Sequence, residues 1–325
     1  MIRTIRVSLV AVVASTLALT GCSLSGENNA SAEAPEILQV SNPTALSNTS
    51  LHYANSSGIF EQHGLTVETR NAQSGAQSLP LLLNGQLHFA AADPVSALTA
   101  ISQGNPIKIV VGGNVVPADP EADISALLAK DDSSIRSVAD LDGTTVAVNA
   151  LRSFSQLGLQ AAIDENGGDS TTVNWIEAGF AQMPDAVERG TVDAAAAAEP
   201  FVTAGKDAGL RLVSKGGLST TMAGVPQVTY IATTDFVNRN PEIVKSFVDS
   251  INESNSALGA TPELIREVGK TSTDMTPDQL AAVTLPTFGP PLTLDSIAKL
   301  ETYMVRYGIL SAPIENLADH VVVQD

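Results

Sequence analysis

The sequence predicts an α/β fold made of two similar lobes with a ligand cleft between them. The first observation is a repeated phrase, because residues 79–94 return in closely similar form as residues 183–200. The second is the alternation of strand and helix patterns, which is typical of βαβ units and parallel sheets. That alternation has the same order in both halves of the chain, so one lobe is predicted to repeat the other.

Each copy of the repeat predicts a short helix, a glycine stop and a buried strand. A proline, Pro80 or Pro184, begins the helix, because its missing N–H would be unpaired in the first turn anyway. A glycine just past the helix supplies the left-handed residue that ends it. The strand then ends at an acid–proline corner, Asp93-Pro94 or Glu199-Pro200. Two such corners, one on each lobe, predict a cleft between them.

The remaining elements divide the chain between the two lobes. Strands of the first lobe are expected at 37–40, 65–69, 107–111 and 228–232, with helices at 51–60, 94–104, 241–258 and 294–307. The second lobe is expected to hold strands at 124–130, 144–148 and 173–176 and a helix at 154–165. We therefore assign 36–123 and 222–325 to lobe 1 and 124–221 to lobe 2. The chain then crosses twice between the lobes, and two crossings make a hinge.

The N-terminus predicts a lipoprotein signal peptide over residues 1–21. Arg3 and Arg6 precede an apolar run that is too short to span a bilayer. The sequence Leu-Thr-Gly-Cys at 19–22 resembles the lipobox of bacterial lipoproteins, in which the signal is cut before a cysteine that is then lipidated. Cys22, the only cysteine, is the predicted lipidation site, and an ordinary signal peptide is the alternative. Residues 22–35 are polar and predict a flexible tether.

Composition and motifs exclude several classes of function. A net charge of −18 argues against a nucleic-acid partner. It also requires that any anionic ligand be held by local donors. The sequence lacks a Gly-x-Ser-x-Gly elbow and a glycine-rich phosphate loop, and its four histidines lack metal-ligand spacing. We therefore expect neither a catalytic site nor a metal site.

The chain resembles ABC-transporter solute-binding proteins of the nitrate, sulfonate, taurine and thiamine-pyrimidine-precursor group. The matching phrases, besides both copies of the repeat, are residues 58–65, 140–143 with 146–149, 199–201 and 307–310. They cover nearly the whole chain after the signal peptide, in order. The resemblance implies a two-lobed type II periplasmic-binding-protein fold that closes on a small solute.

The resemblance also implies the function of a solute-binding receptor for an ABC importer. Such a receptor is not an enzyme and needs no cofactor. It delivers a small organic solute, with a sulfonate or taurine-like ligand favoured, to a membrane permease driven by an ATPase. We expect a monomer held by its lipid anchor in the cell envelope, on the outer face of the cytoplasmic membrane. A pyrimidine precursor or nitrate is the alternative ligand, and a receptor for a membrane sensor or an extracellular enzyme is the alternative function.

The expected ligand-binding residues follow from the position of the strands. In open parallel sheets, ligands bind beyond the carboxyl ends of the strands, where helix N-termini point. That rule selects Thr44, Ser74, Gln77, Asp93, Asn114, Asn149, Arg152, Ser153, Phe154, Phe180 and Glu199. The resemblance adds His52, which with Tyr53 opens the first helix, where the family often has an aromatic residue lining the cleft.

Different roles are expected for these residues. The guanidinium of Arg152 would grip a sulfonate or carboxylate in bidentate fashion, unless it is solvated or paired with Glu177. Ser153 would cap its own helix or offer a hydroxyl to the ligand. Phe154 and Phe180 would stack on a flat or alkyl ligand.

The two acids of the repeat point to the charge of the ligand. Asp93 is either a helix cap or a ligand contact, and Glu199 is expected in the cleft or at the hinge. If both face the cleft, they disfavour a bare inorganic anion. They then favour a ligand that also carries an ammonium group or N–H donors.

Overall fold

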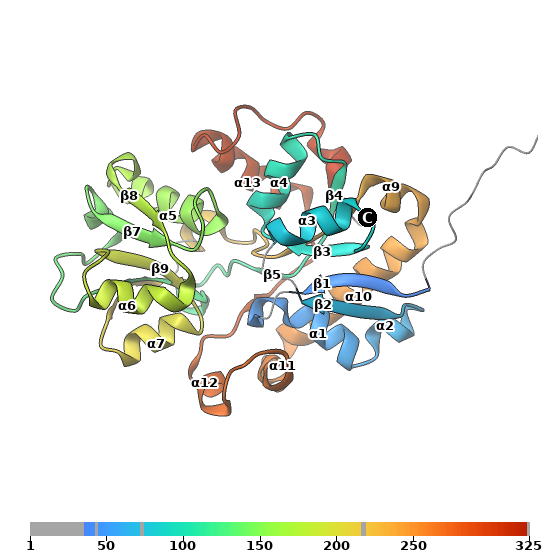
Figure 1. Ribbon diagram of the computed structural model, residues 1–325, viewed down its shortest axis with the longest axis horizontal. Helices are drawn as coiled ribbons and strands as arrows, with labels where there is room; N and C mark the ends of the chain where they lie inside the picture. The colour runs from blue at the N-terminus through green and yellow to red at the C-terminus, as the bar shows by residue number, and fades with distance from the viewer. Residues whose placement is uncertain (1–35, 43–44, 72–74, 216–218, 324–325) are drawn as a thin grey trace, which may run out of the picture. The chain divides into compact units, whose positions relative to one another are not determined.

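The computed structural model describes residues 36–42, 45–71, 75–215 and 219–323. The predicted signal peptide, tether and lipidation site at Cys22 lie outside these residues, as do Thr44 and Ser74. The described chain forms two five-stranded mixed sheets with helices on both faces of each (Figure 1). The expected α/β class is therefore confirmed.

The first sheet has the strand order β2-β1-β3-β11-β4. Its strands are β1 (Leu38–Asn42), β2 (Val67–Asn71), β3 (Phe89–Ala92), β4 (Ile107–Gly112) and β11 (Thr229–Thr233). β1, β2 and β3 are parallel, whereas β11 runs antiparallel to both β3 and β4. We call this sheet and its helices the first lobe.

The second sheet has the order β10-β6-β9-β7-β8. Its strands are β6 (Ser125–Ala129), β7 (Thr145–Val148), β8 (Asn174–Glu177), β9 (Ala194–Ala198) and β10 (Arg211–Lys215). β7, β8 and β9 are parallel, and β6 runs antiparallel to β9 and β10. We call this sheet and its helices the second lobe.

The two sheets share one arrangement, as the repeat predicts. In each, three parallel strands are followed by one antiparallel strand and a fifth strand. The antiparallel strand is always the one that arrives from the other lobe, β6 in the second and β11 in the first. The division of the chain into lobe 1 and lobe 2 at the stated residues stays a prediction.

Helices cover both faces of each sheet. In the first lobe they are α1 (Thr49–Ser56), α2 (Ile59–Gln62), α3 (Gly75–Leu83), α4 (Pro94–Ser102), α9 (Thr234–Arg239), α10 (Pro241–Ala260), α11 (Glu263–Ser272), α12 (Pro277–Ala282) and α13 (Leu294–Arg306). In the second lobe they are α5 (Phe154–Glu165), α6 (Met183–Glu188) and α7 (Phe201–Asp207), and α8 (Ser219–Met222) follows β10.

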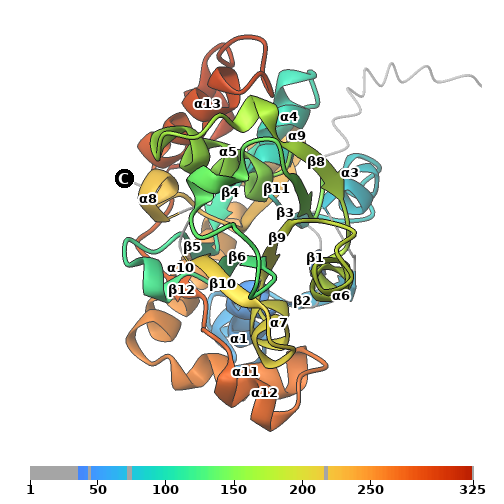
Figure 2. The same cartoon turned by 90° about the vertical axis from the view of Figure 1, so that its left-hand side faces the viewer.

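Separate hydrophobic clusters lie on the two faces of each sheet. In the first lobe, α4 and α13 cover one face, and α1, α2 and α10 cover the other. Phe247 of α10 stacks on Phe89 of β3 with ring centroids 3.9 Å apart. In the second lobe, α5 packs on one face and α6 and α7 on the other (Figure 2). The buried alanines of β9 allow these helices to approach the sheet closely.

The glycine stops of the repeat have the predicted conformation. Gly85 and Gly190 have φ angles of 72° and 70°. In both copies the glycine N–H and the next N–H return to carbonyls of the preceding helix, as in a Schellman motif. The predicted helix start is correct in the second copy only, since Pro184 lies in the first turn of α6. Pro80 lies inside α3, which begins at Gly75.

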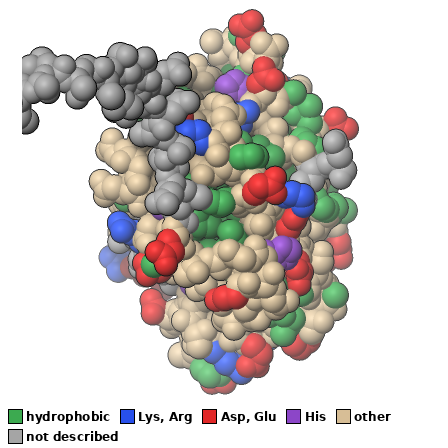
Figure 3. Space-filling model, turned by 90° about the vertical axis from the view of Figure 1, so that its right-hand side faces the viewer, with side chains coloured by type: hydrophobic (Ala, Val, Ile, Leu, Met, Phe, Trp, Pro, Cys, Tyr) green, Lys and Arg blue, Asp and Glu red, His purple; other side chains and the backbone are tan. Residues whose placement is uncertain are grey.

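Several elements were not expected from the sequence. They are β10, α7, α8, α9, α11, α12 and a two-stranded sheet of β5 (Asn114–Val115) and β12 (Thr287–Phe288). Lys and Arg side chains are interspersed with Asp and Glu on the face shown in Figure 3. Within the residues that the structure describes, every helix falls short of the length and apolar character that a bilayer crossing demands.

Replacing Gly85 tests the matched helix stops. A Cβ at Gly85 would meet nothing within 4 Å. The only cost of Gly85→Ala is therefore the strain of an alanine in the left-handed conformation, which lowers the free energy of unfolding by about 1 kcal/mol. Gly85→Asn is the control, because Asn tolerates this conformation better. The free energy of unfolding, measured with urea, should be highest for the wild type, lower for Gly85→Asn and lowest for Gly85→Ala. Equal stability of the three proteins would contradict the assignment.

Candidate ligand-binding site

A cavity of about 390 Å³ is lined by residues of both lobes. We call it the aromatic pocket. The first lobe contributes residues 45–47, 273–275, 279, 284 and 286, and the second contributes 124, 180 and 198–201. The pocket therefore lies where β9 ends, at one of the acid–proline corners that the repeat predicts.

Two phenylalanines form the apolar wall of this pocket. Phe180 follows β8, and Phe201 is the first residue of α7, just after β9. Their rings are nearly parallel, with centroids 6.4 Å apart and an interplanar angle of 13°. Both side chains are partly exposed, so each ring keeps surface that a ligand can contact. The expected position of Phe180 beside a ligand cavity fits this geometry.

Glu199 connects the two lobes at the aromatic pocket. Its carboxylate accepts hydrogen bonds from the N–H and the hydroxyl of Thr203 in α7, both at 3.0 Å. It also accepts the N–H of Thr284, in the first lobe, at 3.1 Å. Glu199 thus holds the first turn of its own helix and one backbone group of the opposite lobe.

Asp93 makes the corresponding contacts at the other corner. As the N-cap of α4 it accepts the N–H groups of Val95 at 2.8 Å and Ser96 at 3.1 Å. The backbone N–H of Phe154, the first residue of α5 in the second lobe, also acts on this carboxyl group and lowers its pKa. Burial raises the pKa of Asp93, although the N–H groups of Val95, Ser96 and Phe154 act against the rise. The carboxylate therefore lies between two helix N-termini, one from each lobe.

A third set of contacts joins α5 to the end of α13. The hydroxyl of Tyr307 donates to Asp164, and that of Tyr303 donates to Glu165, both at 2.8 Å. Burial and the bond to Asp164 raise the pKa of the Tyr307 hydroxyl. Burial alone would raise the pKa of Asp164, but hydrogen bonds from Ser170 and Tyr307 outweigh it and lower that pKa.

Arg152 lies at the edge of a second cavity of about 410 Å³. Ser96 and Thr99 of α4, and Gln103 just after this helix, also line the cavity. The Nη2 of Arg152 donates to the carbonyls of Gly308 at 3.3 Å and Ile309 at 2.8 Å. The alternative pairing with Glu177 is not observed among the described residues, where Glu177 accepts the Leu151 N–H.

Three of the expected ligand-binding residues, Asn114, Ser153 and Phe154, are buried in the structure. Phe154 is only 5% exposed and packs with α4 and α13 in the core of the first lobe, so its ring is covered by protein, and its stacking on a ligand stays a prediction. Asn114 is fully buried and donates to the side chain of Gln227. Its Oδ1 has no hydrogen-bond partner in the described part of the chain.

The remaining expected residues lie in different surroundings. Ser153 caps α5 by accepting the N–H of Gln156 and donates to Asn149 at 3.3 Å, which favours its capping role. His52 is half-buried in α1, and burial lowers its pKa. Gln77 is exposed in α3. These residues are absent from the linings of the aromatic pocket and the cavity beside Arg152, as far as the described residues show.

The sequence did not single out three residues at the aromatic pocket, Phe201, Asp274 and Thr284. Phe201 could have been found, because it directly follows the acid–proline corner. Asp274 and Thr284 lie in loops beside α12, a region without a clear periodic pattern. Only the fold brings these loops to Glu199.

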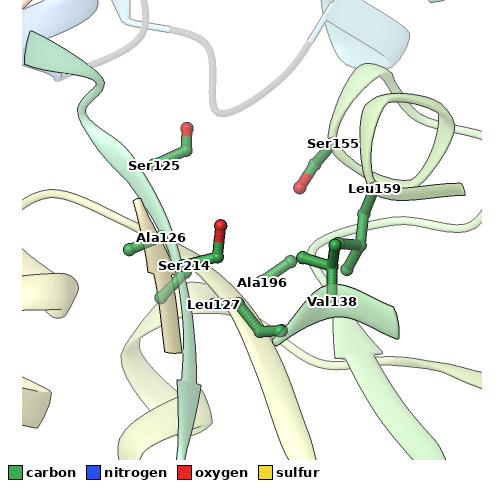
Figure 4. A pocket seen from close by; sticks show the side chains of 9 residues that line it. Ser125, Ala126, Leu127, Val138, Ser155, Leu159, Ala196 and Ser214 are labelled. Carbon is green, nitrogen blue, oxygen red and sulfur yellow. The ribbon is translucent and has the colours of Figure 1, made fainter. Parts of the chain in front are cut away.

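A smaller cavity lies inside the second lobe, where Ser125, Ser155 and Ser214 converge (Figure 4). Its volume of about 30 Å³ suffices for about one water molecule. It is too small for an organic solute.

The comparisons with known proteins agree with this architecture. A family model described as NMT1/THI5 like matches residues 47–265. The chain belongs to the NMT1/THI5-like family. A protein of Brucella abortus named as a candidate binding protein is 27% identical over 273 residues, which cover 83% of this NMT1/THI5-like chain and 79% of that protein.

Solved structures show the same fold at low sequence identity. The periplasmic aliphatic sulphonate-binding protein of Escherichia coli matches with a TM-score of 0.72 and 18% identity, over 90% of this chain and 94% of that one. The ligand-binding component of an ABC-type import system from Staphylococcus aureus matches with a TM-score of 0.72 and 13% identity, over 88% and 96%. The NMT1/THI5-like chain thus has the expected type II periplasmic-binding-protein fold.

The raised pKa of Asp93 predicts a pH-dependent difference from Asp93→Asn. A pKa that is raised in the folded state means that folding favours the protonated form of Asp93. This form stabilises the fold fully below the ordinary pKa of an aspartic acid, 3.8, and the stabilisation is lost as the pH rises. Asn keeps a capping oxygen and does not titrate. The unfolding free energy of the wild type, relative to the variant, should therefore fall as the pH rises from 4 to 7. Urea unfolding checks this, and a constant or rising difference would contradict it.

Proposed function

We propose that this chain is the solute-binding receptor of an ABC importer and that the aromatic pocket is its ligand site. The observation that carries the proposal is the lining of this pocket by both lobes. A solute that contacts both lobes stabilises their contact, which is what a population shift toward the closed form requires. The likeness to the Staphylococcus aureus import component supports the transport role.

The ligand of this receptor is a small organic molecule, and the pocket volume and mostly apolar lining suit one. A pyrimidine precursor fits, because a flat ring stacks on Phe180 or Phe201 and an amino group can donate to Glu199. Nitrate fits poorly, since the described lining offers it no basic side chain. Lipidation at Cys22 would hold the receptor on the outer face of the cytoplasmic membrane, near its permease.

A sulfonate or taurine-like ligand is the second candidate, and it depends on Arg152. Both hydrogen bonds of this side chain to the described residues use Nη2, which leaves Nη1 and Nε as donors at the edge of the second cavity. Such a guanidinium can hold a sulfonate through two N–H groups. The similar folds of sulfonate-binding proteins from Escherichia coli and Xanthomonas axonopodis support this candidate.

A thermal-shift panel with two variants separates the candidates. Taurine, alkylsulfonates, nitrate and aminopyrimidines are added to the wild type, Phe201→Ala and Arg152→Ala. A ligand at a hundred times its Kd adds about 2.7 kcal/mol of stability. We expect the best hit to lose its shift in Phe201→Ala and keep it in Arg152→Ala.

The reverse result would assign the site to Arg152 and a sulfonate. A shift that survives in both variants would overturn both candidate sites. Recovery of the bound molecule with unchanged mass separates a receptor from an enzyme, and uptake assays with and without the neighbouring permease separate transport from sensing.

A further inference from the structure

We propose that the aromatic pocket selects an organic cation that bears N–H donors, with the carboxylate of Glu199 as its counter-charge. The inference rests on the proposed function, because it names the class of solute that the same pocket takes. It depends on the charges that line the pocket, the geometry of Glu199 and the two aromatic rings.

The charge of the pocket is one-sided. Its described lining contains Glu199 and Asp274 but neither Lys nor Arg. The internal segments 43–44, 72–74 and 216–218 add no basic residue, since their sequences contain none. Lys215 lies near, but its ammonium donates to the Glu121 carbonyl and the Thr284 hydroxyl and does not line the pocket. An anion placed here would meet two carboxylates without a facing base.

The carboxylate of Glu199 is oriented before any ligand arrives. Oε1 accepts the Thr203 hydroxyl and the Thr284 N–H, and Oε2 accepts the Thr203 N–H. A carboxylate offers about four lone-pair positions, and the described residues use three of them, which leaves one position on Oε2. A cationic N–H donor at that position would form a charge-assisted hydrogen bond, roughly twice as strong as a neutral one.

The rings of Phe180 and Phe201 suit the same ligand class. The face of an aromatic ring carries partial negative charge and attracts a cation within about 6 Å of the ring centre. The apolar part of the ligand would contact the rings and Met275, which also lines the pocket. Asp274 is an exposed residue of this lining and adds to the negative field of the pocket.

A shape-matched series of probes tests the charge preference. We use 2-phenylethylamine, 2-phenylethanol and 3-phenylpropanoate, which are cationic, neutral and anionic at pH 7, with the full chain and ligand-observed NMR titrations up to about 10 mM. Charged hydrogen bonds contribute about 1.5–3 kcal/mol, so the amine should bind at least about tenfold more tightly than the other two. Glu199→Gln, which keeps the shape, should weaken amine binding by a similar factor.

A second variant keeps the test independent of folding at the corner. Asp274→Lys changes an exposed side chain and should weaken amine binding while strengthening that of the carboxylate. Equal affinity for the three probes, unchanged amine binding in Glu199→Gln, or no amine binding up to about 10 mM would overturn the proposal. If Phe201→Ala abolishes binding but Glu199→Gln does not, the site stands and the charge class is wrong. If Phe201→Ala leaves binding unchanged, the site itself is wrong.

Discussion

Two carboxylates, Asp93 and Glu199, each hold the first turn of a helix in their own lobe. Glu199 also accepts a backbone N–H of the opposite lobe, and the Phe154 N–H of the opposite lobe lowers the pKa of Asp93. A helix N-terminus has unpaired N–H groups and a positive dipole end, so an acid placed there is fixed in position. Because both acids follow the third strand of their sheet, the repeat places them as a matched pair. Helix N-termini thus fix both acids in their own lobes, from where they face the opposite lobe.

The two corners differ in what surrounds them. Asp93 lies between two helix N-termini and beside the buried Phe154, so the lobes are packed together there. Glu199 opens onto a cavity with two aromatic rings. The α5–α13 contacts, made by Tyr303 and Tyr307, lie on the side of Asp93. One corner is thus suited to hold the lobes together, and the other to receive a solute.

The sequence predicted what depends on short-range chemistry. The glycine stops, the caps at Asp93 and Ser153, and the buried strand β9 follow from residue types at fixed spacings. The helix α5 was placed at the residues where the structure has it. Contacts between distant segments could not be predicted this way. Arg152 bonds to carbonyls at 308 and 309, and Phe154 enters the core of the other lobe, because the fold brings α13 against α5.

The distance between the lobes tests the central account most directly. Spin labels at the exposed positions 206 in α7 and 278 in α12, in a Cys22→Ser background, report that distance by double electron–electron resonance without ligand. The account predicts one narrow population for the parent protein and a longer, broader one for Asp93→Ala with Glu199→Ala. The control pair Asp185→Ala with Glu267→Ala removes two exposed acids in surface ion pairs and should change nothing. An unchanged distribution in the first pair would contradict the account.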